Sequence, residues 1–257
     1  MLIFKSLLLG IVQGLTEFFP VSSSAHLKLI SMLFNIKEDI LFDLCCHLGT
    51  TIAAIIFLRK DIINIIRQKH YWIIFLAILP LFPVYFLLKS PINYFSQIKF
   101  LPFSLLLTSL ILFICSKIQI KENENLSSKR KIKDVLLIGV MQAFALIPGL
   151  SRSGWTISSG YLRGWKIEEA IKFSFLLAIP TILGGNFLEG LKYFKNAPEI
   201  DNASFGCYLI GFLASLTVGF LVIKFIFLIR SHKKLKPFAW YLLGLAFFSF
   251  IYLYFVK

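Results

Sequence analysis

Residues 17–26 read EFFPVSSSAH, and they interrupt an apolar stretch that otherwise runs from residue 2 to residue 33. Pro20 cannot continue a helix without kinking or ending it. The serines that follow it are favoured N-cap residues for a new helix. Each half of the stretch holds about 12 to 16 residues, which is shorter than the roughly 20 residues of a bilayer-spanning helix. The stretch therefore predicts two short helices joined by a polar turn.

The composition indicates that the surroundings of this turn are a membrane. Hydrophobic residues make up 58% of the 257 residues and charged residues only 16%, whereas soluble domains carry about a quarter charged residues. The net charge of +14 sits between the apolar stretches and not in an aromatic-interleaved patch, so we expect no nucleic-acid partner. We predict an all-α integral membrane protein with one membrane domain, residues 1–257, and six full spans: about 40–58, 71–88, 100–116, 167–188, 204–228 and 238–256.

A second break has the same character as the first. Residues 147–154, IPGLSRSG, interrupt an apolar stretch that covers residues 134–162. Irregular backbone at membrane depth survives only where protein or water covers it. Both stretches therefore predict re-entrant hairpins, in which one half-helix enters the membrane and the next one leaves it.

The two hairpins resemble each other and predict an internal repeat. Residues 10–13 (GIVQ) parallel residues 139–142 (GVMQ), and the spacing between Ser22 and Ser24 recurs at Ser151 and Ser153. Three spans follow each hairpin, and an odd number of spans inverts the second copy relative to the first. We expect repeat one at about 1–117, a cytoplasmic linker at 117–133 and repeat two at about 134–257.

The positions of Lys and Arg predict the orientation. Most of the 27 Lys and Arg residues fall in loops on one side of the expected spans, and the side richer in these residues faces the cytoplasm. Both termini would then lie outside. The two hairpins would enter from opposite faces, so we expect their tips to meet at membrane depth.

Ionisable residues inside apolar stretches mark function by default, because their burial is expensive. Glu17, His26, Arg152 and His47 stand out. Arg152 lies between two serines at the start of a half-helix, where backbone N–H groups favour an anion. The planar fork of an arginine also matches phosphate oxygens. The second break therefore predicts a phosphate-type anion site.

The roles of the first-break residues stay open at this level. Glu17 and Gln13 share one helix face. They either support an ion pair that holds the hairpin, bind a divalent cation through oxygen ligands, or provide a general base. A new helix that begins near Ser22 would place the side chains of Ser23 and His26 on the same side. These two side chains would then supply the parts of a nucleophilic site. His47, four residues after Asp43, either supports this site or hydrogen-bonds across the repeat interface.

Four segments carry a resemblance to a known family. GIVQGLTEFFPVSSSAHL (10–27) and PGLSRSGWTISSG (148–160) resemble the two signatures of the undecaprenyl-pyrophosphate phosphatase family of the bacitracin-resistance type, and HLGTTIAA (47–54) and FSFLLAIP (173–180) are also similar to it. The resemblance implies hydrolysis of the C55 lipid pyrophosphate to the monophosphate, which recycles the carrier lipid for cell-wall synthesis. It also implies a divalent cation (Mg²⁺, Mn²⁺ or Ca²⁺), a bacterial plasma-membrane location and a site open to the outer face.

The resemblance extends to single positions. Glu17 matches the acidic motif residue, Ser23 the proposed nucleophile, His26 the essential histidine and Arg152 the phosphate-binding arginine. Two small departures, Ala25 and Ile167, leave the chemistry untouched. We expect pyrophosphate contacts from Ser22, Ser24, Ser151, Arg152, Ser153 and Gly154, metal contacts from Glu17 and Gln13, and supporting contacts from His47 and Gln142.

Four questions remain open from sequence. A lipid-phosphate transporter or flippase would use the same broken-helix anion site, although it has no need of a nucleophile beside a base. Attack by Ser23 and direct attack by water are both compatible with these residues, as are both divisions of acid and base roles between Glu17 and His26. The sequence is also compatible with a homodimer.

Overall fold

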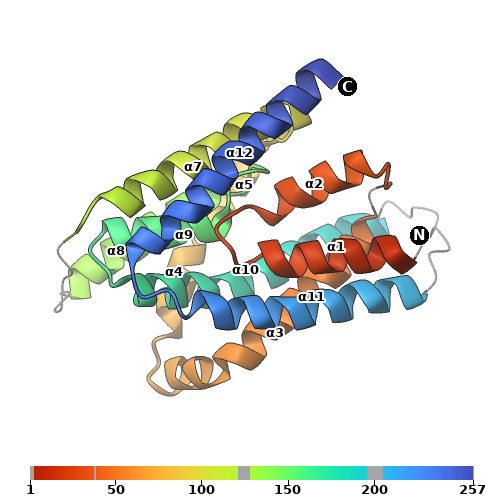
Figure 1. Ribbon diagram of the computed structural model, residues 1–257. Helices are drawn as coiled ribbons and strands as arrows, with labels where there is room; N and C mark the ends of the chain where they lie inside the picture. Colours follow the sequence, from red (N-terminus) through yellow and green to blue (C-terminus); the bar gives the residue numbers. More distant parts are fainter. Residues whose placement is uncertain (1–2, 38, 121–127, 196–204, 257) are drawn as a thin grey trace.

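The computed structural model describes residues 3–37, 39–120, 128–195 and 205–256, and within them every regular element is helical. The chain combines long helices with short ones (Figure 1). Their bounds are α1 Ile3–Thr16, α2 Ser23–Leu33, α3 Ile40–Arg67, α4 Tyr71–Ile78, α5 Leu81–Leu87, α6 Lys89–Phe95, η1 Ile98–Phe100, α7 Leu101–Lys117, α8 Ser128–Phe144, α9 Arg152–Leu162, α10 Ile167–Lys195, α11 Phe205–Ile226, η2 His232–Leu235, α12 Lys236–Ile251 and a final π-helical turn Tyr252–Val256.

Among the described residues, five helices are long and apolar enough to cross a membrane. They are α3, α7 with η1, α10, α11, and α12 with its two flanking turns. A sixth span is present if Tyr71–Leu87 and Lys89–Phe95, which bend by 84° at their junction, are taken together. The chain is therefore a multi-pass helical membrane protein.

The expected span at 71–88 is not continuous. α4 ends at Ile78 and α5 begins at Leu81, so the helix is interrupted at Leu79 and Pro80. Proline has no N–H to donate, and its ring clashes with the carbonyl four residues earlier. Pro180 lies inside α10 without ending it, so the neighbours of a proline decide whether it breaks a helix.

Both predicted helix breaks are present. α1 and α2 flank the first, and α8 and α9 flank the second. Ser151 caps α9, because its Oγ atom accepts from the Gly154 N–H at 3.1 Å. Ser22 occupies the corresponding position before α2 with a left-handed φ of 68° and no side-chain cap bond.

Part of the stretch predicted as a linker, 117–133, is helical. α8 already begins at Ser128, because lysine and arginine are good helix formers and let the helix extend beyond the apolar stretch. Residues 121–127 of that linker lie outside the described residues.

Small residues let the half-helices approach neighbouring spans. A Cβ atom added to Gly10 of α1 would lie 2.6 Å from the carbonyl oxygen of Gly211 in α11. A Cβ atom added to Gly139 of α8 would collide in the same way with the carbonyl oxygen of Ala77 in α4. Backbone contact of this kind is typical of helices that associate within membranes.

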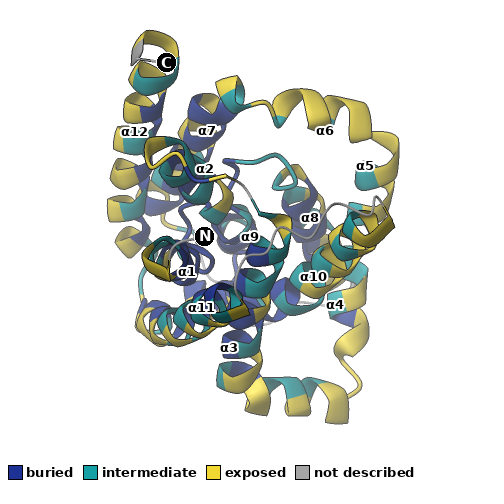
Figure 2. Ribbon diagram, turned by 90° about the vertical axis from the view of Figure 1, so that its right-hand side faces the viewer, coloured by how far each residue is buried: buried dark blue, intermediate teal, exposed yellow. Residues whose placement is uncertain are grey.

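Burial is highest around the breaks and lowest on the outer helices (Figure 2). α9 lies among the other helices, and most of its residues are buried. In the span that contains α12, only 22% of the most apolar 18-residue stretch is buried inside the protein. The remaining apolar surface is suited to contact with lipid.

Candidate active site

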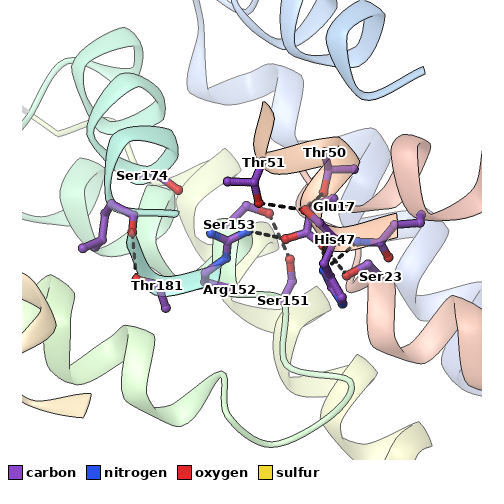
Figure 3. A network of polar contacts seen from close by, with 12 residues as sticks. Glu17, Ser23, His47, Thr50, Thr51, Ser151, Arg152, Ser153, Ser174 and Thr181 are labelled. Atoms are coloured by element: carbon purple, nitrogen blue, oxygen red, sulfur yellow. Dashed lines mark hydrogen bonds and ion pairs between the residues drawn. The ribbon is translucent and has the colours of Figure 1, made fainter. Parts of the chain in front are cut away.

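Glu17 joins the two helix breaks (Figure 3). It directly follows α1, and its side chain is only 5% exposed. Its Oε1 atom accepts from Nη2 of Arg152 at 2.5 Å, and its Oε2 atom accepts from the hydroxyl of Ser23 at 2.8 Å. Ser23 belongs to the first break and Arg152 to the second, so a single carboxylate connects both.

Arg152 retains one unused arm of its guanidinium. It is the first residue of α9, and its Nη2 atom is engaged by Glu17. The Nη1 atom is buried and finds no hydrogen-bond partner within the described residues. A buried donor left unpaired costs about 1–3 kcal/mol, and more when it is charged. An anion that accepts from Nη1 would remove this cost.

Gln13 and His47 lie beside the other oxygen of Glu17. Nε2 of Gln13 donates to Oε2 at 2.9 Å and lies 2.8 Å from Nδ1 of His47. The same His47 nitrogen is 3.6 Å from Oε2 of Glu17. His47 therefore lies against the carboxylate itself, in addition to the Gln13 amide that supports it.

Glu17 and Gln13 carry oxygen atoms of the kind that bind divalent cations. No group of three or more His, Cys, Asp or Glu side chains that could hold a metal ion exists among the described residues. The carboxylate of Glu17 and the amide of Gln13 can supply oxygen ligands, and Oε1 of Gln13 is buried without a hydrogen-bond partner in the described part of the chain. Mg²⁺ is usually held by one or two carboxylates together with substrate phosphates, and this donor set matches that pattern.

His26 is held by α12 and not by Glu17. Its Nδ1 atom is 2.7 Å from the carbonyl oxygen of Ser22, and its Nε2 atom is 2.6 Å from the hydroxyl of Tyr241. A carbonyl oxygen only accepts, so the neutral ring carries its proton on Nδ1 and accepts at Nε2 from Tyr241. Ser23 and His26 thus have different partners, because Tyr241 draws the imidazole towards α12, where the two rings stack.

Serine side chains tie the two breaks together. The Gly149 N–H of the second break donates to Oγ of Ser24 at 3.4 Å, and Oγ of Ser153 donates to the carbonyl of Phe19 at 2.9 Å. Each break therefore contributes one serine that bonds to the backbone of the other. This double contact holds Ser23 and Arg152 at the same carboxylate.

A cavity of about 250 Å³ opens beside Glu17. Ser153 and Gly154 are not among its lining residues; Ser153 bonds to Phe19, and the Gly154 N–H is taken by Ser151. The sequence-predicted residues that do line it are Glu17, Ser22, Ser23, Ser24, His47, Gln142, Ser151 and Arg152.

α10 contributes side chains that sequence reasoning missed. Thr181, Asn186 and Glu189 also line the cavity, and Oγ1 of Thr181 donates to Oε1 of Gln142 at 3.4 Å. Asn186 and Glu189 are three residues apart and so share one helix face. A polar pair at this spacing, at the end of the expected span 167–188, is the signal that could have found them.

Fold and site together define a multi-pass helical membrane protein in which a serine and an arginine from two helix breaks meet at one buried glutamate. Comparison with known proteins identifies the family: residues 6–248 match the family described as bacitracin resistance protein BacA, and the chain belongs to it.

Three similar proteins carry the name undecaprenyl-diphosphatase. The one from Protochlamydia amoebophila is 38% identical over 261 residues, covering 98% of this chain and 99% of that protein. The one from Thermosipho melanesiensis is 39% identical over 257 residues, covering 95% and 97%. The one from Caldicellulosiruptor bescii is 37% identical over 254 residues, covering 95% and 94%.

Proposed function

We propose that this chain hydrolyses undecaprenyl pyrophosphate to undecaprenyl phosphate and inorganic phosphate, and so recycles the carrier lipid for cell-wall synthesis and confers bacitracin resistance. Its family and its full-length relatives support this activity. The observation that carries the proposal is the arrangement at Glu17: a serine hydroxyl on one oxygen, a guanidinium on the other, and a free arm of that guanidinium.

Arg152 and Glu17 would exchange partners when substrate binds. The free Nη1 atom of Arg152 first donates to an oxygen of the pyrophosphate, and phosphate oxygens then compete with Glu17 for the rest of the guanidinium. A carboxylate whose cationic partner is shared holds a proton more readily. Substrate binding therefore prepares Glu17 to take the hydroxyl proton of Ser23.

The transfer itself proceeds at the terminal phosphorus. Oγ of Ser23 attacks it as its proton passes to Glu17, and the bond from this phosphorus to the bridging oxygen breaks. Undecaprenyl phosphate leaves with the electron pair of that bond. Water then cleaves the phosphoserine, with Glu17 as the proton carrier, and releases inorganic phosphate.

His26 acts in this scheme as a positioning residue. Its Nδ1–H group holds the carbonyl of Ser22, the residue with the left-handed backbone directly before Ser23. Tyr241 keeps the ring in the tautomer that makes this bond possible. A divalent cation, held by Glu17 and Gln13 together with the substrate, would neutralise phosphate charge.

Phosphate release tests the activity. Detergent-purified protein is incubated with a C15 or C55 isoprenyl pyrophosphate and Mg²⁺, Mn²⁺ or Ca²⁺, and a parallel sample receives chelator. We expect phosphate release that depends on the cation and is abolished by Arg152→Ala. No release from folded wild-type protein would refute the proposal, and lipid-translocation assays would then test the transporter alternative.

The stereochemistry at phosphorus tests the serine pathway. A phosphoserine intermediate requires two displacements, so a chiral terminal phosphate would keep its configuration. Trapped phosphoserine at Ser23 would support this pathway. Inversion of configuration would show that water attacks directly and that Ser23 only binds phosphate.

The proposed architecture is an inverted repeat with two re-entrant hairpins. Equivalent glycines, Gly10 and Gly139, make equivalent backbone approaches: α1 packs on α11, and α8 packs on α4. The serine pairs also correspond, because the hydroxyls of Ser22 and Ser24 are 3.3 Å apart, as are those of Ser151 and Ser153. These matched contacts support two copies of one unit.

We place the catalytic cavity towards the outer face of the bacterial plasma membrane. Its α10 residues lie in the half of that helix that leads to the Lys- and Arg-poor side. The opposite ends of α3 and α10 lie among the basic residues that favour the cytoplasm. The isoprenoid tail would stay in the bilayer while its pyrophosphate enters between the breaks.

A further inference from the structure

A second cavity, which we call the basic vestibule, lies at the opposite ends of the helices that carry the catalytic cavity. It measures about 1260 Å³ and is bordered by residues of α3, α4, α10 and α11. α3 contributes His47 to the catalytic cavity and Asp61 to the vestibule. At 1.5 Å of helix per residue these positions are about 20 Å apart. The two cavities are therefore separate chambers along one pair of helices.

The wall of the vestibule carries an excess of positive charge. Two ion pairs are internal to it: Lys172 with Asp61 at 2.8 Å, and Arg230 with Glu168 at 2.7 Å. The remaining cations are lysines that make no ion pair within the described part of the chain, and Glu169 is the one further carboxylate on the wall. These lysines are Lys131, Lys166 and Lys224.

The rest of the wall is apolar and aromatic. Phe57, Ile73, Leu176 and Phe220 line it together with Phe227. Lys224 lies in an apolar part of α11. In such surroundings the aliphatic part of a lysine side chain packs against apolar groups while its ammonium group reaches a polar space. A cavity that combines lysines with a hydrophobic wall suits an anionic amphiphile better than a free inorganic ion.

Phenyl rings separate the vestibule from the catalytic glutamate. The Phe57 and Phe227 centroids are 5.0 Å apart, those of Phe227 and Phe175 5.7 Å, and those of Phe175 and Phe18 5.0 Å. Phe18 follows Glu17 directly in the chain. A phosphate cannot pass through these packed rings, so a ligand in the vestibule would be bound independently of the catalytic cavity.

We propose that the basic vestibule is a second lipid site, which binds a long-chain isoprenoid monophosphate on the side of the protein opposite the catalytic cavity. The identity of the occupant rests on the proposed function, whose product is such a monoester. A phosphate monoester carries about −1.5 to −2 charge at neutral pH. The three lysines that make no ion pair among the described residues match this charge better than they match the single charge of a phosphodiester lipid.

The test uses a benzophenone-tagged farnesyl monophosphate and mass-spectrometric mapping of the cross-linked peptides. The variant is the triple change Lys131→Gln, Lys166→Gln and Lys224→Gln. The matched control changes three lysines that do not line the vestibule, namely Lys60→Gln, Lys69→Gln and Lys117→Gln. Competition is measured with undecaprenyl phosphate and with the phosphodiester lipid phosphatidylglycerol.

We expect labels on the α10 and α11 peptides of the vestibule, reduced about tenfold by the vestibule triple, since each exposed charge contact contributes modestly. The control triple should leave the labels unchanged, and undecaprenyl phosphate should compete better than phosphatidylglycerol. Equal loss in both triples, or equal competition by both lipids, would overturn the proposal by showing general attraction of anionic lipid.

Phosphate release in the same preparations separates this proposal from the proposed function. Full phosphatase activity without vestibule labelling overturns the second lipid site alone. Specific labelling in a folded chain that releases no phosphate overturns the proposed function and leaves the lipid site standing. The vestibule triple should keep wild-type kcat, because none of its lysines lines the catalytic cavity.

Discussion

Arg152→Lys separates the two tasks that one guanidinium performs. In the wild type, Nη2 donates to Oε1 of Glu17 at 2.5 Å, and Nη1 is buried without a partner among the residues that the structure describes. A lysine keeps a positive charge beside Glu17 but has no second arm at a fixed angle. Arg152→Ala is a harsher change, because a buried ion left without its partner costs about 3–5 kcal/mol and threatens folding.

The expected loss follows from one missing donor. Removing a hydrogen-bond donor aimed at developing charge lowers kcat by about 10²–10³-fold, or about 2.7–4 kcal/mol of activation free energy. We therefore expect Arg152→Lys to fold, to bind substrate and to lose this factor in kcat. The assay is phosphate release from a C15 isoprenyl pyrophosphate at saturating substrate, with the thermal unfolding midpoint measured in the same detergent.

Arg163→Lys is the matched control. Nε of Arg163 donates to Asp134 at 2.6 Å, and Asp134 is fully buried, so this pair resembles the pair at Glu17. It does not line the catalytic cavity. The control should keep wild-type kcat. If Arg152→Lys also kept wild-type kcat, the free arm of Arg152 would not be a donor to the substrate.

Three further predictions concern the nucleophile, the packing and the histidine. Ser23→Ala should lower kcat by about 10²–10⁴-fold, the range for a group engaged in proton transfer, and should eliminate phosphoserine; undiminished turnover would exclude Ser23 from the chemistry. Gly139→Ala should lower the free energy of unfolding by about 1–3 kcal/mol through overpacking against α4. The control is Gly244→Ala, because a Cβ atom at Gly244 meets none of the described atoms within 4 Å. Equal melting temperatures of the two variants would contradict the packing of α8 on α4. Tyr241→Phe leaves Nε2 of His26 without its donor, which costs about 1–3 kcal/mol. We expect ¹⁵N NMR to show a weaker preference for the Nδ1–H tautomer of His26, and phosphate-release assays to show a lower kcat at unchanged KM. An unchanged tautomer would show that Tyr241 does not set it.

The helix breaks could be predicted because local chemistry determines them. Pro20 and Pro148 stand inside apolar stretches next to serines, and no continuous helix tolerates that pattern easily. The meeting of Glu17 and Arg152 could also be anticipated, since charges of opposite sign at membrane depth need partners. In the structure, Nη2 of Arg152 lies 2.5 Å from Oε1 of Glu17.

Other features depend on contacts between distant segments. His26 turns towards Tyr241 of α12 because of how α2 and α12 pack, and no local pattern around His26 encodes that neighbour. The cavity residues Asn186 and Glu189 were missed because the face that α10 presents to the breaks is set by its packing along α3. The interruption at Pro80 lies in a stretch without polar residues, where hydropathy alone predicts an unbroken span.

If the two breaks form one catalytic site at Glu17, Ser23 and Arg152 depend on each other in the chemical step, and a double-mutant cycle on kcat measures this dependence. Phosphate release is measured for Ser23→Ala, for Arg152→Lys and for the double variant. Groups that act in the same chemical step show strongly non-additive losses. We therefore predict that the double variant is barely slower than the slower single variant. Losses that multiply in full would show that Ser23 and Arg152 act independently, and would contradict a single composite site.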